Sequence, residues 1–177
     1  MKINSLEAET NAVIRVAEDM AAAARTAPKT RGIDHIETLI VTGDDLKELA
    51  DAMKRYGEQT GQAFFVRDSK NIENSKAVLF IASGHHVRGL NETCALCGAA
   101  NCAEASKEKK NCVYDPIDLG IALGSAVSVA ATAHIDNRIM FSAGVGAKLV
   151  GWFDESLPMV FAIPLSTSGK SIYFDRG

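Results

Sequence analysis

The chain has 177 residues, of which 47% are hydrophobic and 23% charged, a balance typical of one globular domain with enough apolar material for a core. Its 19 basic and 22 acidic side chains give a net charge of −3. This charge excludes the strongly basic surface of a nucleic-acid binder or of a protein held on an anionic membrane. The opening MKINSLEAETNAVIRV has acidic residues where a secretory signal has its apolar core, so we expect a cytoplasmic protein.

The first half of the chain predicts two helices separated by a strand. Residues 10–27 place apolar side chains on one helical face, and Pro28 ends that helix. Residues 35–43 have the β-branched content of a strand. Residues 44–61 form an amphipathic pattern whose acidic start suits the positive end of a helix dipole.

The second half predicts a buried strand at 76–83, because KAVLFIAS is a nearly continuous apolar run. The apolar stretch 117–136 is rich in Ala, Gly and Ser and is bounded by aspartates, so we interpret it as a fully buried core helix near 116–134 and not as a membrane span. A strand around RIMFSA, a short helix around GAKLVGWF and a last strand, PMVFAIPLS at 158–166, follow. This alternation predicts a single α/β or α+β domain over residues 1–177.

All four cysteines lie in residues 84–112, a polar stretch that interrupts the predicted core as an insertion and is called the cysteine segment below. Their spacing is C-x2-C-x4-C-x9-C, at Cys94, Cys97, Cys102 and Cys112. A C-x2-C pair presents two sulfurs on one tight turn, and Gly98 beside it permits unusual backbone angles. Since disulfides are rare in the cytoplasm, four thiolates indicate a metal centre.

Three kinds of site compete for these cysteines: an iron–sulfur cluster, an all-thiolate zinc site, and disulfides or free thiols. CALCGAANC resembles the C-x2-C-G-x3-C half of small four-iron domains in anaerobic redox enzymes, which favours a 4Fe-4S cluster over zinc. His85 and His86 are close in sequence, but four cysteines already complete a tetrahedral set. We therefore interpret both histidines as exposed loop residues.

Four motifs carry a resemblance to a known family: ARTAPKTRGIDHIETLIV, CALCGAANC, NCVYDPIDLGIALGSAV and SGKSIYFDR. Together they resemble the bacterial and archaeal proteins that contain a ferredoxin domain and are grouped as domain of unknown function 2148. The resemblance extends over nearly the whole chain, and it implies an iron–sulfur protein without stating a reaction.

The order helix, Ala27-Pro28 turn, strand and acidic-start helix is also similar to that of the flavin-dependent nitroreductases. This second resemblance implies an α+β fold with a mixed sheet flanked by helices. It also implies an intertwined homodimer that binds FMN at the subunit interface. Gly120 and Gly124 have the G-x-x-x-G spacing that lets two backbones approach closely, which agrees with a homodimer.

The stretch RTAPKTRG, residues 25–32, is called the cation turn below, because Arg25, Lys29 and Arg31 surround its proline. A flavin needs cations for its phosphate and for its N1/O2 edge, so these three residues are the candidate FMN contacts. The alternative is that they complement the negative end of the preceding helix and meet solvent. Lys170 and Arg176 in the last motif are weaker candidates.

The sequence therefore predicts a cytoplasmic iron–sulfur redox protein with FMN as second cofactor, acting in electron transfer or as an oxidoreductase. A redox partner protein is expected, whereas nucleic acid and membrane are not. Two rivals stay open: a non-enzymatic module stabilised by zinc or a cluster, and a sensor that responds to cluster loss. Hydrolase and nucleotide-triphosphatase motifs are absent from the sequence, and no catalytic residue or substrate is assigned.

Overall fold

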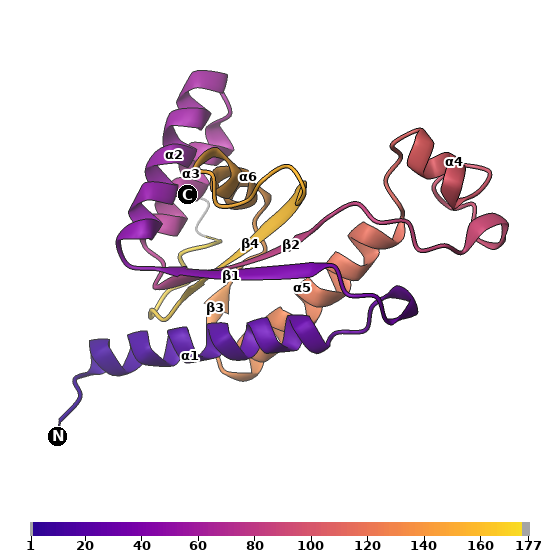
Figure 1. Ribbon diagram of the computed structural model, residues 1–177. Coiled ribbons are helices and arrows are strands. Elements are labelled where there is room, and N and C mark those ends of the chain that lie inside the picture. Colours follow the sequence, from indigo (N-terminus) through magenta and orange to yellow (C-terminus); the bar gives the residue numbers. More distant parts are fainter. Residues whose placement is uncertain (1, 175–177) are drawn as a thin grey trace.

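The structure is a computed structural model that describes residues 2–174 (Figure 1). Within this range the elements are α1 (Ser5–Thr26), β1 (Ile36–Thr42), α2 (Asp44–Thr60), α3 (Ala63–Glu73), β2 (Ala77–Ser83), α4 (Cys102–Lys107), α5 (Tyr114–Thr132), β3 (Asp136–Asn137), α6 (Phe141–Leu149) and β4 (Met159–Ser166). Two short 3-10 turns, Thr30–Gly32 and Asn91–Thr93, lie in the connections. The chain thus has the mixed helix and strand content that the sequence predicts.

The four strands form one sheet in the order β1-β2-β4-β3, and every strand pair in the described residues is antiparallel. The expectation of a mixed sheet is therefore wrong in strand direction. The cause is α3, a helix missing from the sequence-based prediction. Because α2 and α3 pack against each other as a helical hairpin, the chain returns to the end of the sheet where β1 finished, and Thr42 lies opposite Ala77.

The sheet is the middle of three layers, with β2 buried along its whole length. Alternate side chains of β2 enter two separate cores, because successive residues of a strand point to opposite faces. Leu79 and Ile81 pack with α1 and α5, whereas Val78 and Phe80 pack with α2, α3 and α6. Figure 1 shows the same division, with α1 and α5 on one side of the sheet and the α2–α3 hairpin on the other.

The region after α5 differs from the prediction of a strand around residues 138–143 followed by a helix at 146–153. Only β3 and a single bridge from Met140 to Ala162 extend the sheet there, and α6 already begins at Phe141. Gly144 explains the close packing of α6 on β4, because a Cβ atom at this position would collide with the carbonyl oxygen of Val160. A helix can approach the strand this closely only where it has no side chain.

Helix α5 is not the fully buried helix that the sequence analysis predicts. Leu119, Ala122 and Ala126 are buried against α1 and the sheet, whereas the opposite face is open. On that open face Ile117 is 43% and Ile121 is 39% exposed, and a Cβ atom at Gly120 or Gly124 would meet no atom within 4 Å. Among the described residues no helix is long and apolar enough to span a membrane.

The cysteine segment leaves the sheet at the end of β2 and returns to the core at α5. In Figure 1 it forms a projection around α4, beyond the end of the sheet.

Candidate functional site

The four cysteines line one pocket in the projection. Cys112 is buried and lies just before α5, whereas Cys94, Cys97 and Cys102 are partly exposed. The rest of the wall is largely apolar and includes Val87, Leu90, Ala99, Ala105 and Val113, and the buried side of the pocket also contains Arg88. The folded chain thus brings together all four predicted metal ligands.

Local backbone turns bring the first two cysteines to the pocket. Gly98 has a φ of 75° and donates its N–H to the Ala95 carbonyl at 3.0 Å, which closes the turn that follows Cys94. A positive φ costs glycine little, and this agrees with the role that the sequence analysis gave to Gly98. Asn101 then caps α4 by accepting the Glu104 N–H at 3.0 Å, so that Cys102 is the first residue of that helix.

Hydrogen-bond donors lie near the sulfurs and the turn that carries them. The backbone N–H of Asn91 donates to the Cys102 Sγ at 3.3 Å. Lys110 Nζ lies 3.4 Å from the Gly98 carbonyl oxygen. The bond to Glu108 raises the pKa of Lys110, and the negative charge of Cys97 acts in the same direction. All four cysteines are free thiols in the structure, and no group of three or more His, Cys, Asp or Glu side chains among the described residues is arranged to hold a metal ion.

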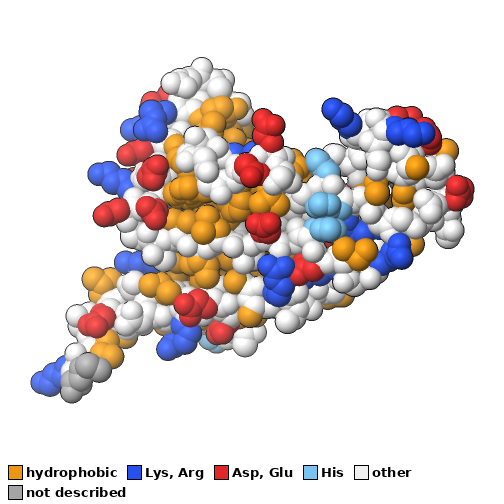
Figure 2. All heavy atoms as spheres, in the orientation of Figure 1, with side chains coloured by type: hydrophobic (Ala, Val, Ile, Leu, Met, Phe, Trp, Pro, Cys, Tyr) orange, Lys and Arg blue, Asp and Glu red, His pale blue; other side chains and the backbone are white. Residues whose placement is uncertain are grey.

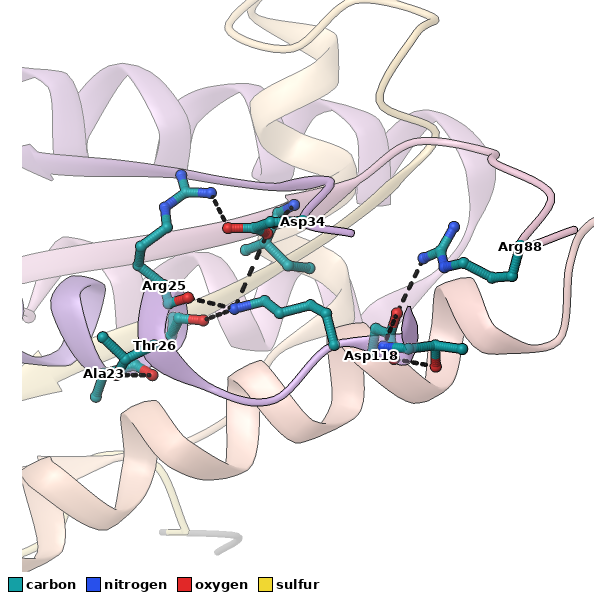
Figure 3. Close-up of polar contacts among 10 residues, drawn as sticks. Ala23, Arg25, Thr26, Asp34, Arg88 and Asp118 are labelled. Carbon is teal, nitrogen blue, oxygen red and sulfur yellow. Dashed lines mark hydrogen bonds and ion pairs between the residues drawn. The ribbon is translucent and has the colours of Figure 1, made fainter. Parts of the chain in front are cut away.

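A buried ion network lies at the base of the cysteine segment. The guanidinium of Arg88 lies 3.0 Å from Asp118 Oδ2 through Nη2 (Figure 3). Its Nη1 lies 2.9 Å from Asp115 Oδ1, and all three side chains are at most 2% exposed. Asp118 also accepts the N–H of Thr30 at 3.1 Å and its hydroxyl at 2.8 Å, and Asp115 accepts the His86 N–H at 3.0 Å. These donors help to stabilise two buried carboxylates that share one arginine.

The three cationic side chains of the cation turn bond mainly to other groups of the same chain. Lys29 Nζ donates to the carbonyls of Ala24 and Arg25 at 2.6 and 2.5 Å, so it caps the end of α1, and its side chain is only 5% exposed. Burial is the main reason that its pKa is lowered. Arg25 forms an ion pair with Asp34 at 2.6 Å (Figure 3), and Arg31 donates to the Arg88 carbonyl at 2.6 Å.

Lys170 does not join the other three cations. It lines a separate depression with Arg67 and Lys70, on the α3 side of the sheet. Arg176 lies outside the described residues. Arg25, Lys29 and Arg31 thus lie in one turn, and Lys170 lies elsewhere.

A pair of stacked histidines joins the start of β1 to the start of the cysteine segment. The rings of His35 and His86 have centroids 3.5 Å apart and planes inclined by 16°. Burial lowers the pKa of His35, and the charges of His86 and Arg88 act in the same direction. Figure 2 shows histidine side chains gathered beside the base of the projection. His85 and His86 are exposed, as predicted, but the stacking with His35 was not foreseen.

The Arg88 network gives the first prediction. Arg88→Met leaves two buried carboxylates without their cation and should lower the free energy of unfolding by about 3–5 kcal/mol. Arg25→Met removes an ion pair whose arginine side chain is 52% exposed, and it should cost only about 0–1 kcal/mol. Urea denaturation of the two variants tests this, and similar small losses in both would contradict a structural role for the network.

Comparisons with known proteins agree with these features. The family model described as "Uncharacterized protein containing a ferredoxin domain (DUF2148)" matches residues 108–176. An uncharacterized protein of Archaeoglobus fulgidus is 40% identical over 185 residues, which cover 99% of this chain and 98% of that protein.

Solved structures of low sequence identity share the fold. A putative nitroreductase in complex with FMN from Desulfovibrio desulfuricans has a TM-score of 0.57 at 14% identity, covering 89% of this chain and 75% of its own. A nitroreductase family protein from Clostridium novyi has a TM-score of 0.58 at 14% identity, and the match covers 94% of this chain and 76% of that protein. The NADPH:FMN oxidoreductase from Vibrio harveyi has a TM-score of 0.56 at 11% identity, and the match covers 97% of this chain and 63% of that protein. The chain has the nitroreductase fold and belongs to the family of ferredoxin-domain proteins of unknown function 2148.

Proposed function

We propose that this protein is an iron–sulfur redox protein in which Cys94, Cys97, Cys102 and Cys112 hold one 4Fe-4S cluster. The observation that carries the proposal is that all four cysteines line a single pocket. The family's ferredoxin domain and the flavoprotein neighbours both suggest a redox function. Residues 84–112 would then be a cluster-binding segment inserted into one nitroreductase-like domain.

The residues around the pocket fit an anionic thiolate centre. The Asn91 N–H donates to Cys102, Lys110 lies close to Cys97, and apolar side chains limit the access of water to the buried Cys112. Hydrogen bonds to sulfur and a restricted solvent contact are the means by which proteins tune such centres. These features suit an all-thiolate centre with negative charge on its sulfurs.

FMN as second cofactor is the finer part of the proposal. Its support is the fold shared with solved proteins whose names include FMN, and the half-exposed guanidinium of Arg25 in the cation turn. When both are bound, a cluster passes single electrons and a flavin converts between one- and two-electron steps. In this chain Lys29 is buried and caps the end of α1, whereas the side chain of Arg25 is 52% exposed.

A homodimer completes the proposal. The open face of α5 presents Ile117 and Ile121 on either side of Gly120, and Gly124 follows on the same face. Since glycine lets two helices come into backbone contact, this face suits a second copy of the chain. The redox partner protein stays a prediction.

The cluster is tested by replacing each cysteine with serine. Loss of one thiolate should reduce the iron content of anaerobically reconstituted protein by at least about tenfold and loosen the cysteine segment. Helices α1 and α2 should persist, because they belong to the two cores of the sheet. Iron, sulfide and zinc analysis is the measurement, and Ser106→Ala, an exposed change in the same segment, is the control. Full iron content in Cys112→Ser would remove Cys112 from the site, and zinc without iron would favour the structural module.

The flavin is tested by reconstitution with excess FMN followed by gel filtration. Lys29→Ala frees the end of α1 and removes a cation from the turn, so it should weaken FMN binding by about tenfold or more and lower the flavin potential. Cluster content should not change. Lys54→Ala, on the exposed face of α2, is the matched control. If the wild-type protein retains no FMN, the flavin part of the proposal is wrong.

The dimer is tested by light scattering at micromolar concentration. Wild-type protein should have twice the mass of one chain. Gly124→Leu places a side chain in open space, so the single chain should still fold, but two helices could no longer meet there and the mass should halve. A monomeric wild-type protein would refute the dimer.

A further inference from the structure

One nitrogen of the buried Arg88 guanidinium has no hydrogen-bond partner among the described residues. Its Nη1 donates to the His86 carbonyl at 2.6 Å and its Nη2 to Asp118 at 3.0 Å, whereas its Nε is buried without a partner. Burying a donor without a partner costs stability, so such a group calls for an explanation.

The groups around Arg88 are themselves held by hydrogen bonds, which limits how far its side chain can turn. Asp118 is held by the N–H and hydroxyl of Thr30, and Asp115 is held by the His86 N–H. The backbone of Arg88 is held as well, because its carbonyl accepts from Arg31 at 2.6 Å. The guanidinium is therefore fixed in position by its two carboxylates, and the Nε–H stays where the fold places it.

The same residue is part of the wall of the cysteine pocket, beside Val87, Leu90 and Asn91. Asn91 already donates its backbone N–H to a cysteine sulfur of that pocket. A second donor in this wall, buried and unpaired, would find its acceptor in a sulfur-rich group that fills the pocket.

We propose that the Nε–H of Arg88 is a hydrogen-bond donor to the centre held by the four cysteines. This inference rests on the proposed function. A donor fixed in position before the centre binds requires no rearrangement, and its bond to sulfur strengthens as the centre gains negative charge. Arg88 thus raises the reduction potential of the centre, in addition to its structural bonds with Asp115 and Asp118.

The test uses wild-type protein grown with 15N-labelled arginine, reconstituted anaerobically with iron and sulfide and then reduced. Pulsed electron paramagnetic resonance should show coupling between the cluster and 15N. Arg88 is the only arginine that lines the cysteine pocket in the described part of the chain, so the label reports on it. A cluster signal without 15N coupling would overturn the inference and leave the proposed function intact. Failure to bind iron, seen by metal analysis, would overturn both.

Two variants add a second measurement. Arg88→Lys keeps a cation near the two aspartates but has no Nε–H, so the 15N coupling should disappear and the potential should become more negative. Asp118→Asn weakens the same ion network but keeps the donor, so it should lower stability while the coupling remains. An unchanged potential in an iron-loaded Arg88→Lys protein would contradict the proposal. If that variant does not fold, the 15N measurement on the wild-type protein decides the question.

Discussion

The buried pairing of Arg88 with Asp115 and Asp118 is the constraint on which the arrangement of the site depends. Arg88 belongs to the beginning of the cysteine segment, and Asp115 lies just beyond its end, where its N–H donates to the Cys112 carbonyl at 3.1 Å. The pairing therefore closes a loop of more than 20 residues at its base. Because unpaired charges in this position would be costly, the two ends of the segment cannot separate without loss of stability.

Beyond this base the cysteine segment has little packing of its own. Its buried apolar residues within the projection are few, namely Ala99, Ala105 and Cys112, and several of its residues have positive φ angles, among them Ala95 and Lys109. The proposed metal centre would give such a segment much of its order, since metal binding and local folding are coupled. The core supplies a fixed attachment, and the bound centre would supply the remaining stability.

Much of the fold could be predicted from local patterns, and the failures have physical causes. The buried strand at 76–83, the helix at 44–61 and the final strand follow from hydrophobic periodicity, which is a local signal. Helix α3 was missed although Phe65, Ser69 and Ile72 have helical spacing, and it is this helix that turns the chain back so that β2 runs antiparallel to β1. The four cysteines could be predicted to share one site because they are closely spaced in the sequence. Arg88 was not found, because its partners lie 27 and 30 residues away and only the fold brings them to it.

Helix α5 connects the features that were proposed separately. Its first turns carry Asp115 and Asp118, one face forms the core with α1, and the opposite face carries Gly120 and Gly124. At 1.5 Å per residue, Gly124 is only about 9 Å along the helix axis from Asp118. A second copy bound on this face would thus lie close to the ion network that fixes both the cysteine segment and, through Thr30, the cation turn. Helix α5 therefore sets the positions of the cysteine pocket, the cation turn and its own open face at the same time, so a shift of α5 would be transmitted to all three.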